Sequence, residues 1–196
     1  MQGTPARSPS NPYCKSPRLE RIRQTLLELL PAQSDIDIIF KVSSSWLSVH
    51  AFSLHGMDGI IPARFNVSEI YKDSLTGIAR SLLYIASCLQ QLDPDFDTSR
   101  LKLYPSVDAR MERCVSAVQT LVTCDEELIS SVDGLDCLIL QCSYHSNAGN
   151  PRRAWLSLRK ALNIAQLMGL HLPSCTIPGG SQIWAHITQG DRYLVS

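Results

Sequence analysis

The chain has 196 residues, 44% of them hydrophobic, and its 18 Lys and Arg balance its 18 Asp and Glu. A zero net charge gives no field that draws the chain to nucleic acid or anionic lipid, which argues against unaided DNA binding. No apolar run reaches the ~18 residues of a membrane span, and the first residues lack the apolar core of a secretion signal. We therefore expect an intracellular protein. Its seven irregularly spaced cysteines favour reduced thiols over disulfides.

The first 30 residues divide into two parts. Residues 1–17 hold four prolines among serines. Folding such a segment would not gain enough free energy to offset its entropy cost, so we expect a disordered tail. Over residues 18–30, Leu19, Ile22 and Leu26 recur at helical spacing. A dimerising coiled coil is the alternative for this helix, but fewer than two heptads fall short of the ~3–4 wanted, which favours packing on the chain's own domain.

The segments that follow differ in how clearly they are marked. Residues 34–42 predict a helix from a capping pair at their start, despite several β-branched residues. Residues 43–68 contain helix breakers and predict a loop-rich connection with a short helix around Trp46. Residues 74–91 and 107–124 carry apolar residues at helical spacing and predict two helices that pack as a pair.

Residues 130–171 predict two antiparallel helices joined by a short loop. Ser130 or Ser131 can cap the first helix. Each helix has one apolar stripe, so the two stripes can bury each other. The stripes consist of Leu135, Leu138, Ile139 and Cys142 on the first helix, and of Ala154, Leu158, Ala161, Leu162, Ala165 and Met168 on the second.

The ends of the second helix are the best defined in the chain. Asn150 is expected to cap its start, with Pro151 at the first helical position, where a missing N–H costs nothing. Gly169 is expected to end it in a left-handed conformation, with Leu170 packing back near Ala165.

Together these patterns predict an all-α domain over residues 18–196, with about six to eight helices stacked as antiparallel hairpins and no sheet. Residues 182–194 are expected to form the first part of the last helix.

Several motifs, in order along residues 70–196, carry a family resemblance. They are ASCLQQLDP (86–94), DGLDCLILQ (133–141), GNPRRAWL (149–156), AQLMGLH (165–171), Trp184 and DRYL (191–194). In this order they resemble the fungal-specific transcription factor domain, which is the middle homology region of fungal binuclear zinc-cluster transcription factors. The ordered series is more specific than any single motif.

The resemblance implies transcriptional control in the nucleus, by a domain that restrains activity or senses partners and effectors rather than contacting DNA. It also implies control of a metabolic or specialised-metabolite gene set, because such regulators often serve there. In the family the last motif continues into further helices, so the resemblance implies a truncated member.

The zinc cluster of these regulators needs six cysteines, with a C-x-x-C pair in each half. The chain contains no C-x-x-C. We therefore expect no cofactor and no direct DNA binding by this chain, and a protein partner such as a full-length zinc-cluster regulator. The alternative is a stand-alone helical interaction module that competes for such a regulator's dimer surface, or a truncated paralogue without function.

One cluster of side chains is a candidate surface for a partner or a phosphate group. It comprises Arg152, Arg153, Trp155, Arg159 and Lys160, within residues 137–190, which contain no acidic residue. The alternative is an ordinary solvated helix face with Trp155 half-buried in the core. In that case nearby acidic residues would neutralise the cations, namely Asp125, Glu126, Glu127, Asp133 and Asp136.

No enzyme active site and no metal site are predicted. The chain has no G-x-S-x-G, G-x-x-x-x-G-K or H-E-x-x-H motif. Cys137, Cys142 and His145 share a helix but lack a fourth metal ligand. Asp93, Asp95 and Asp97 lack the glycine and glutamate of a calcium loop, so a solvated turn is expected there.

Overall fold

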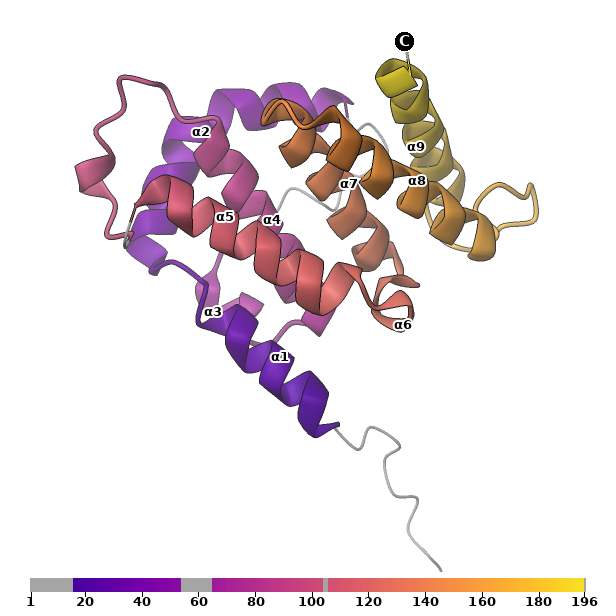
Figure 1. The fold of residues 1–196 in the computed structure, drawn as a ribbon, viewed down its shortest axis with the longest axis horizontal. Coiled ribbons are helices and arrows are strands. Elements are labelled where there is room, and N and C mark those ends of the chain that lie inside the picture. Colours follow the sequence, from indigo (N-terminus) through magenta and orange to yellow (C-terminus); the bar gives the residue numbers. More distant parts are fainter. Residues whose placement is uncertain (1–15, 54–64, 104–105, 196) are drawn as a thin grey trace, which may run out of the picture.

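The computed structural model describes residues 16–53, 65–103 and 106–195. These residues form helices and connecting turns, with no β-strand among them, which confirms the all-α class (Figure 1). Within this part of the chain nine α-helices occur instead of six to eight, because α3 and α6 have only four residues each. The α-helices are α1 (Pro17–Leu27), α2 (Gln33–Ser53), α3 (Val67–Ile70), α4 (Leu75–Gln90), α5 (Val107–Val118), α6 (Glu126–Ile129), α7 (Val132–Asn147), α8 (Pro151–Leu167) and α9 (Gly180–Val195).

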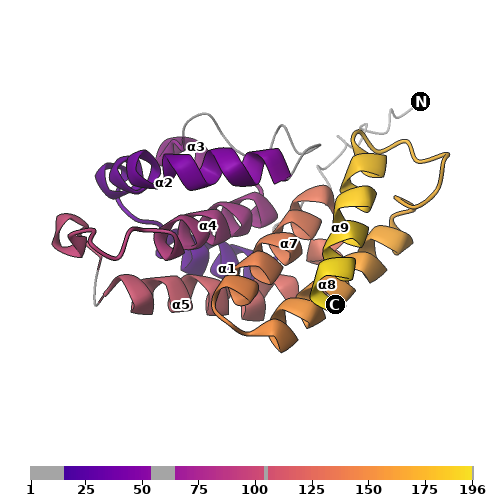
Figure 2. The same ribbon diagram turned by 90° about the horizontal axis from the view of Figure 1, so that it is seen from above.

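Helix α4 lies at the centre of the first half of the domain. The Ser74 hydroxyl caps its start by accepting a hydrogen bond from Gly77 N at 2.9 Å. Twelve of its 16 residues are buried, because α1, α2, α5 and α7 all contact it. Figure 2 shows α4 between α2 and α5. The predicted helix over residues 74–91 and its pairing with the helix after residue 107 are confirmed.

Helix α2 corrects the prediction for residues 43–68. The helix predicted over residues 34–42 continues to Ser53 without a break, so the loop-rich connection is wrong for residues 43–53. The glycines and proline that suggested a loop begin only at Gly56, and Ile36 and Ile39 are buried where α2 contacts α4. Residues 54–64 lie outside the described part of the chain.

Helix α1 packs on the domain as predicted. Ile22 and Leu26 are buried, and α1 contacts α4 and α5. Of the tail predicted for residues 1–17, residues 1–15 lie outside the described residues. Pro17 is instead the first residue of α1, the position where proline costs no hydrogen bond.

The segment predicted as a single helix over residues 107–124 changes its winding near the end. After α5 the chain forms a π-helical turn, η2 (Gln119–Thr123). Thr123 is buried there, and its hydroxyl lies 3.0 Å from Gln141 Oε1 on α7. Its carbonyl accepts a hydrogen bond from Lys160 Nζ on α8 at 2.8 Å. The π-helical turn is therefore held by both helices of the second pair.

The starts of α7 and α8 were predicted at the right places, but not every predicted contact there is present. Ser131, rather than Ser130, caps α7 by accepting a hydrogen bond from Gly134 N at 3.1 Å. Asn150 stands at the N-cap position of α8, but its side chain makes no capping hydrogen bond, so that prediction is wrong. Its amide group instead donates to Ala148 O at 3.4 Å, inside the turn.

The end of α8 follows the predicted left-handed cap. Gly169 has φ of +74°, a conformation that favours glycine. Leu170 N donates to Ala165 O at 3.0 Å, and the Leu170 side chain is buried.

The buried side chains form two clusters with α7 between them. The first, which we call the α4 core, surrounds α4 and includes Cys137 and Leu140 of α7. The second, the α8 core, joins other residues of α7 to α8 and to α9, which contributes Ile183 and Ile187. Helix α7 is thus buried on two sides, whereas α8 is covered on one.

Candidate functional site

The packing of α8 leaves one of its sides in solvent. Six of its 17 residues are buried, and they follow the predicted apolar stripe with Ile164 in addition. Met168 is only partly buried and lies just after the helix. Because this stripe contacts α7 and α9, the residues on the opposite side point outward.

Four of the five predicted surface residues lie on this outward side. Arg152 and Arg153 are exposed, and Trp155 is 40% exposed. The Arg159 guanidinium carbon lies 5.7 Å from the centre of the Trp155 ring, within range of a cation–π contact. Leu156, which sequence analysis did not single out, is 53% exposed beside them. We call these five residues the outer α8 face.

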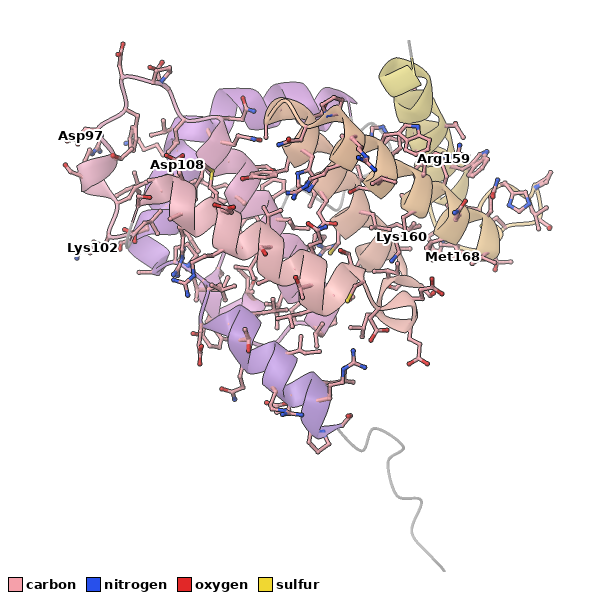
Figure 3. All side chains as sticks on the ribbon, in the orientation of Figure 1. Asp97, Lys102, Asp108, Arg159, Lys160 and Met168 are labelled. Atoms are coloured by element: carbon pink, nitrogen blue, oxygen red, sulfur yellow. The ribbon has the colours of Figure 1, made fainter. Side chains whose placement is uncertain are left out.

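Lys160 has a different environment from the other four. Its ammonium group donates to Thr123 O at the end of the π-helical turn, so it joins α8 to the neighbouring segment. Figure 3 labels Arg159 and Lys160 on α8 at the right, and Asp108 at the left end of α5. Backbone carbonyls of this kind cannot be recognised from sequence.

Most of the nearby acidic residues that could have paired with these cations form ion pairs with other helices. Asp125 lies 3.1 Å from Arg18 of α1. Asp133 and Asp136 lie 2.6 and 3.4 Å from Arg80 of α4. Of the five nearby acids, these three therefore have partners outside α8. The outer α8 face keeps a cationic and aromatic character.

A cleft of about 740 Å³ adjoins this face, between α5 and η2 on one side and the α7 to α8 junction on the other. Its lining includes the buried side chains of Met111 and Val115 on α5. We call it the α5/α8 cleft. Sequence analysis did not find it, because its two walls lie far apart in the chain. It is lined by Asp108, Met111, Glu112, Val115, Ser116, Gln119, Thr120, Cys124, Tyr144, His145, Ala148, Asn150 and Arg153.

The surroundings of two aromatic residues in the cleft shift their pKa values. Burial, reinforced by Arg153, lowers the pKa of His145, so the imidazole is neutral near pH 7. Burial raises the pKa of Tyr144, and Glu112 and Asp108 raise it further. Both side chains therefore offer neutral hydrogen-bonding groups to the cleft.

A second polar cluster lies between α4 and α7, and one of its members is buried. Arg80 contacts both Asp133 and Asp136, and the Asp136 side chain is only 1% exposed. Burial raises the pKa of Asp136 to about 7, although Arg80 opposes that change. Asp136 Oδ1 has no hydrogen-bond partner within the described residues. The cluster joins the two helices across the edge of the α4 core.

Burial of four cysteines disfavours their thiolate form. Cys88, Cys114, Cys137 and Cys142 are free thiols in the two cores, in line with the reduced thiols expected from sequence. Burial raises the pKa of Cys88 to about 12 and that of Cys142 to about 11, so these thiols stay protonated near neutral pH.

Within the described ranges, no group of three or more His, Cys, Asp or Glu side chains is placed to hold a metal ion. In the turn after α4, Asp93 and Asp97 accept hydrogen bonds from the backbone N–H of Asp95 and Ser99. No helix in this part of the chain is both long and apolar enough to cross a membrane.

Comparison with known proteins relates the chain to fungal transcription factors. It is 33% identical over 168 residues to the transcription factor sdnS of Sordaria araneosa, which covers 83% of this chain. It is 37% identical over 182 residues to the transcription factor eupR of a Phoma species, covering 84% of the chain. It is also 34% identical over 163 residues, 80% of the chain, to the dehydrocurvularin biosynthesis regulator of Aspergillus terreus.

The chain spans only part of these relatives: 22% of the Sordaria protein, 39% of the Phoma protein and 22% of the Aspergillus protein. No family model matches the chain. No solved structure matches it either.

Proposed function

We propose that this chain is a regulatory domain of a fungal zinc-cluster type transcription regulator, that it acts in the nucleus without contacting DNA itself, and that it has no enzymatic activity. The observation that carries the proposal is the similarity to transcription factors over four fifths of the chain. The balanced charge and the absence of a C-x-x-C pair support a role other than DNA contact.

The outer α8 face is the proposed contact with a protein partner. Its arginines and Trp155 are of the residue types that dominate the energy of protein interfaces. The proposed partner is a protein with acidic groups, such as a full-length regulator, because residues 137–190 offer cations and no acid. One of the relatives is named a regulator of dehydrocurvularin biosynthesis, which supports control of a specialised-metabolite gene set.

A reporter assay tests this function. The whole chain is fused to an unrelated DNA-binding module in a filamentous fungus, and transcription from a promoter carrying that module's site is measured. We expect a change of several-fold relative to the module alone, because a regulatory domain recruits or blocks other proteins. Unchanged transcription would count against a regulatory role.

Charge reversal on α8 tests the proposed surface. We expect the double variant Arg152→Glu with Arg159→Glu to abolish the effect on transcription, because an acidic partner would then meet like charge. The matched control is Lys102→Glu with Arg113→Glu, which makes the same change of charge at exposed positions away from α8. Equal loss in both double variants would remove the special role of the outer α8 face.

A further inference from the structure

The α5/α8 cleft has the size of a site for a small organic molecule. Its volume of about 740 Å³ lies inside the range of roughly 300–1,000 Å³ typical of ligand pockets. One wall is the ridge of α5 and the π-helical turn, and the other is the end of α7 with the start of α8. Figure 3 labels Asp108 near the start of α5.

The cleft holds three charged side chains without protein partners. Asp108 and Glu112 lie one helical turn apart on α5, and Arg153 lies on α8. Among the described residues, none of the three takes part in an ion pair or a side-chain hydrogen bond. The cleft therefore presents an anionic wall and a cationic wall that do not neutralise each other directly.

A buried polar side chain lies at the cationic wall. His145 is only 4% exposed, yet it lines the cleft. Within the described part of the chain its ring contacts Tyr144 edge to face, and no hydrogen bond reaches its ring nitrogens. Neither ring nitrogen is among the fully buried atoms that lack a partner, so the nitrogens reach solvent, where a ligand can contact them.

The α5 side of the cleft also carries apolar side chains. Met111 and Val115 are 9% and 4% exposed and lie on the α5 side of the cleft. A ligand with a hydrocarbon middle would therefore cover apolar surface there, while its ends reach the charges.

We propose that the α5/α8 cleft binds a small amino-substituted organic acid. Its carboxylate contacts Arg153 and His145, its ammonium group contacts Asp108 and Glu112, and its hydrocarbon chain covers Met111 and Val115. This site goes beyond the proposed function, since it needs neither DNA nor a partner on the outer α8 face. Arg153 belongs to both the cleft and that face, so a bound acid would also alter the charge offered to a partner.

The test uses nuclear magnetic resonance of the whole chain with γ-aminobutyrate, δ-aminovalerate and ε-aminocaproate as probes, because the series spans different distances between the two charges. We expect one member to shift the His145 ring signals saturably, with a dissociation constant on the order of 1 mM for so small a ligand. Glutarate and cadaverine, which carry only one sign of charge, are expected to bind about tenfold more weakly or not at all.

Two variants make the result specific. Arg153→Gln and Asp108→Asn are each expected to weaken binding about tenfold, the loss of one charge contact. Arg113→Gln is the matched control, since Arg113 lies on α5 but does not line the cleft. Arg152→Glu with Arg159→Glu is expected to keep binding, which separates this site from the proposed partner surface.

Three outcomes would overturn the proposal. The first is that no probe shifts the His145 signals saturably. The second is that glutarate or cadaverine binds as well as the amino acids. The third is that Arg153→Gln, Asp108→Asn and Arg113→Gln all bind like the unaltered chain.

Discussion

The α4 core and the α8 core contain helices of similar length that are used in different ways. Twelve of 16 residues are buried in α4, but only six of 17 in α8. Helix α4 is apolar on nearly every side and has neighbours all round it. Helix α8 has one apolar stripe, and its other side carries arginines and Trp155. The comparison teaches that packing encloses the central helix of the first region, while it leaves one side of α8 in solvent.

The two regions also differ in how their charges are balanced. The first region contains both signs and pairs them, as in the contact of Arg80 on α4 with Asp133 on α7. Residues 137–190 contain cations and no acid. Arg152 and Arg153 of α8 are exposed, so the partner proposed above would meet cations there.

The largest expected effect sharpens the contrast in burial. Leu82→Ala removes a fully buried side chain from α4 and should lower the free energy of unfolding by about 2–5 kcal/mol, as measured by urea titration. Leu156→Ala, on the exposed side of α8, should change it by no more than about 0.5 kcal/mol. Similar losses in the two variants would break the comparison.

The next effect concerns Asp136, at the edge of the α4 core. Burial keeps this carboxyl protonated in the folded chain up to about pH 7, whereas the unfolded carboxyl ionises near pH 3.8. The folded state therefore binds more protons between these values. The free energy of unfolding should fall as the pH rises from about 4 to about 7, by at most about 1.4 kcal/mol per pH unit.

Urea titrations across this pH range, with Asp136→Asn as the reference, measure this contribution. The amide does not titrate, so the variant should lose this part of the pH dependence. An identical slope in both proteins would show that Asp136 is ionised in the folded chain over the whole range.

Gly134 tests the close contact between α6 and α7. A Cβ atom at this position would lie 2.4 Å from Ile129 Cα, too close for any side chain. Gly134→Ala should therefore destabilise the chain by about 1–3 kcal/mol in thermal or urea unfolding. Gly149→Ala, in the open turn before α8, has no atom within 4 Å of the new Cβ and should cost only about 1 kcal/mol for its positive φ. The reverse order would contradict the packing described for α6.

The smallest effect compares the starts of α7 and α8. Ser131→Ala removes a capping hydrogen bond and should cost about 1 kcal/mol. Asn150→Ala should cost less, because the Asn150 side chain does not cap α8. Thermal unfolding of the two variants side by side measures the difference, and a larger loss for Asn150→Ala would restore the cap predicted from sequence.

The sequence by itself determined the all-α class, most helix positions and the left-handed end of α8. These features depend on local spacing, on Pro151 and on Gly169, whose effects act within a few residues. It also singled out the arginines and Trp155 of α8, because they lie in a stretch without acidic residues, and it left open a partner surface and an ordinary solvated face.

Only the tertiary structure decided the features that join distant segments. Helix α2 runs to Ser53 and contacts α4. The carbonyl of Thr123 accepts the hydrogen bond that fixes Lys160. The α5/α8 cleft brings Glu112 and Arg153 to one place although 40 positions separate them in the chain. Such contacts depend on how helices pack, and helical periodicity states which side of a helix is buried but not what covers it.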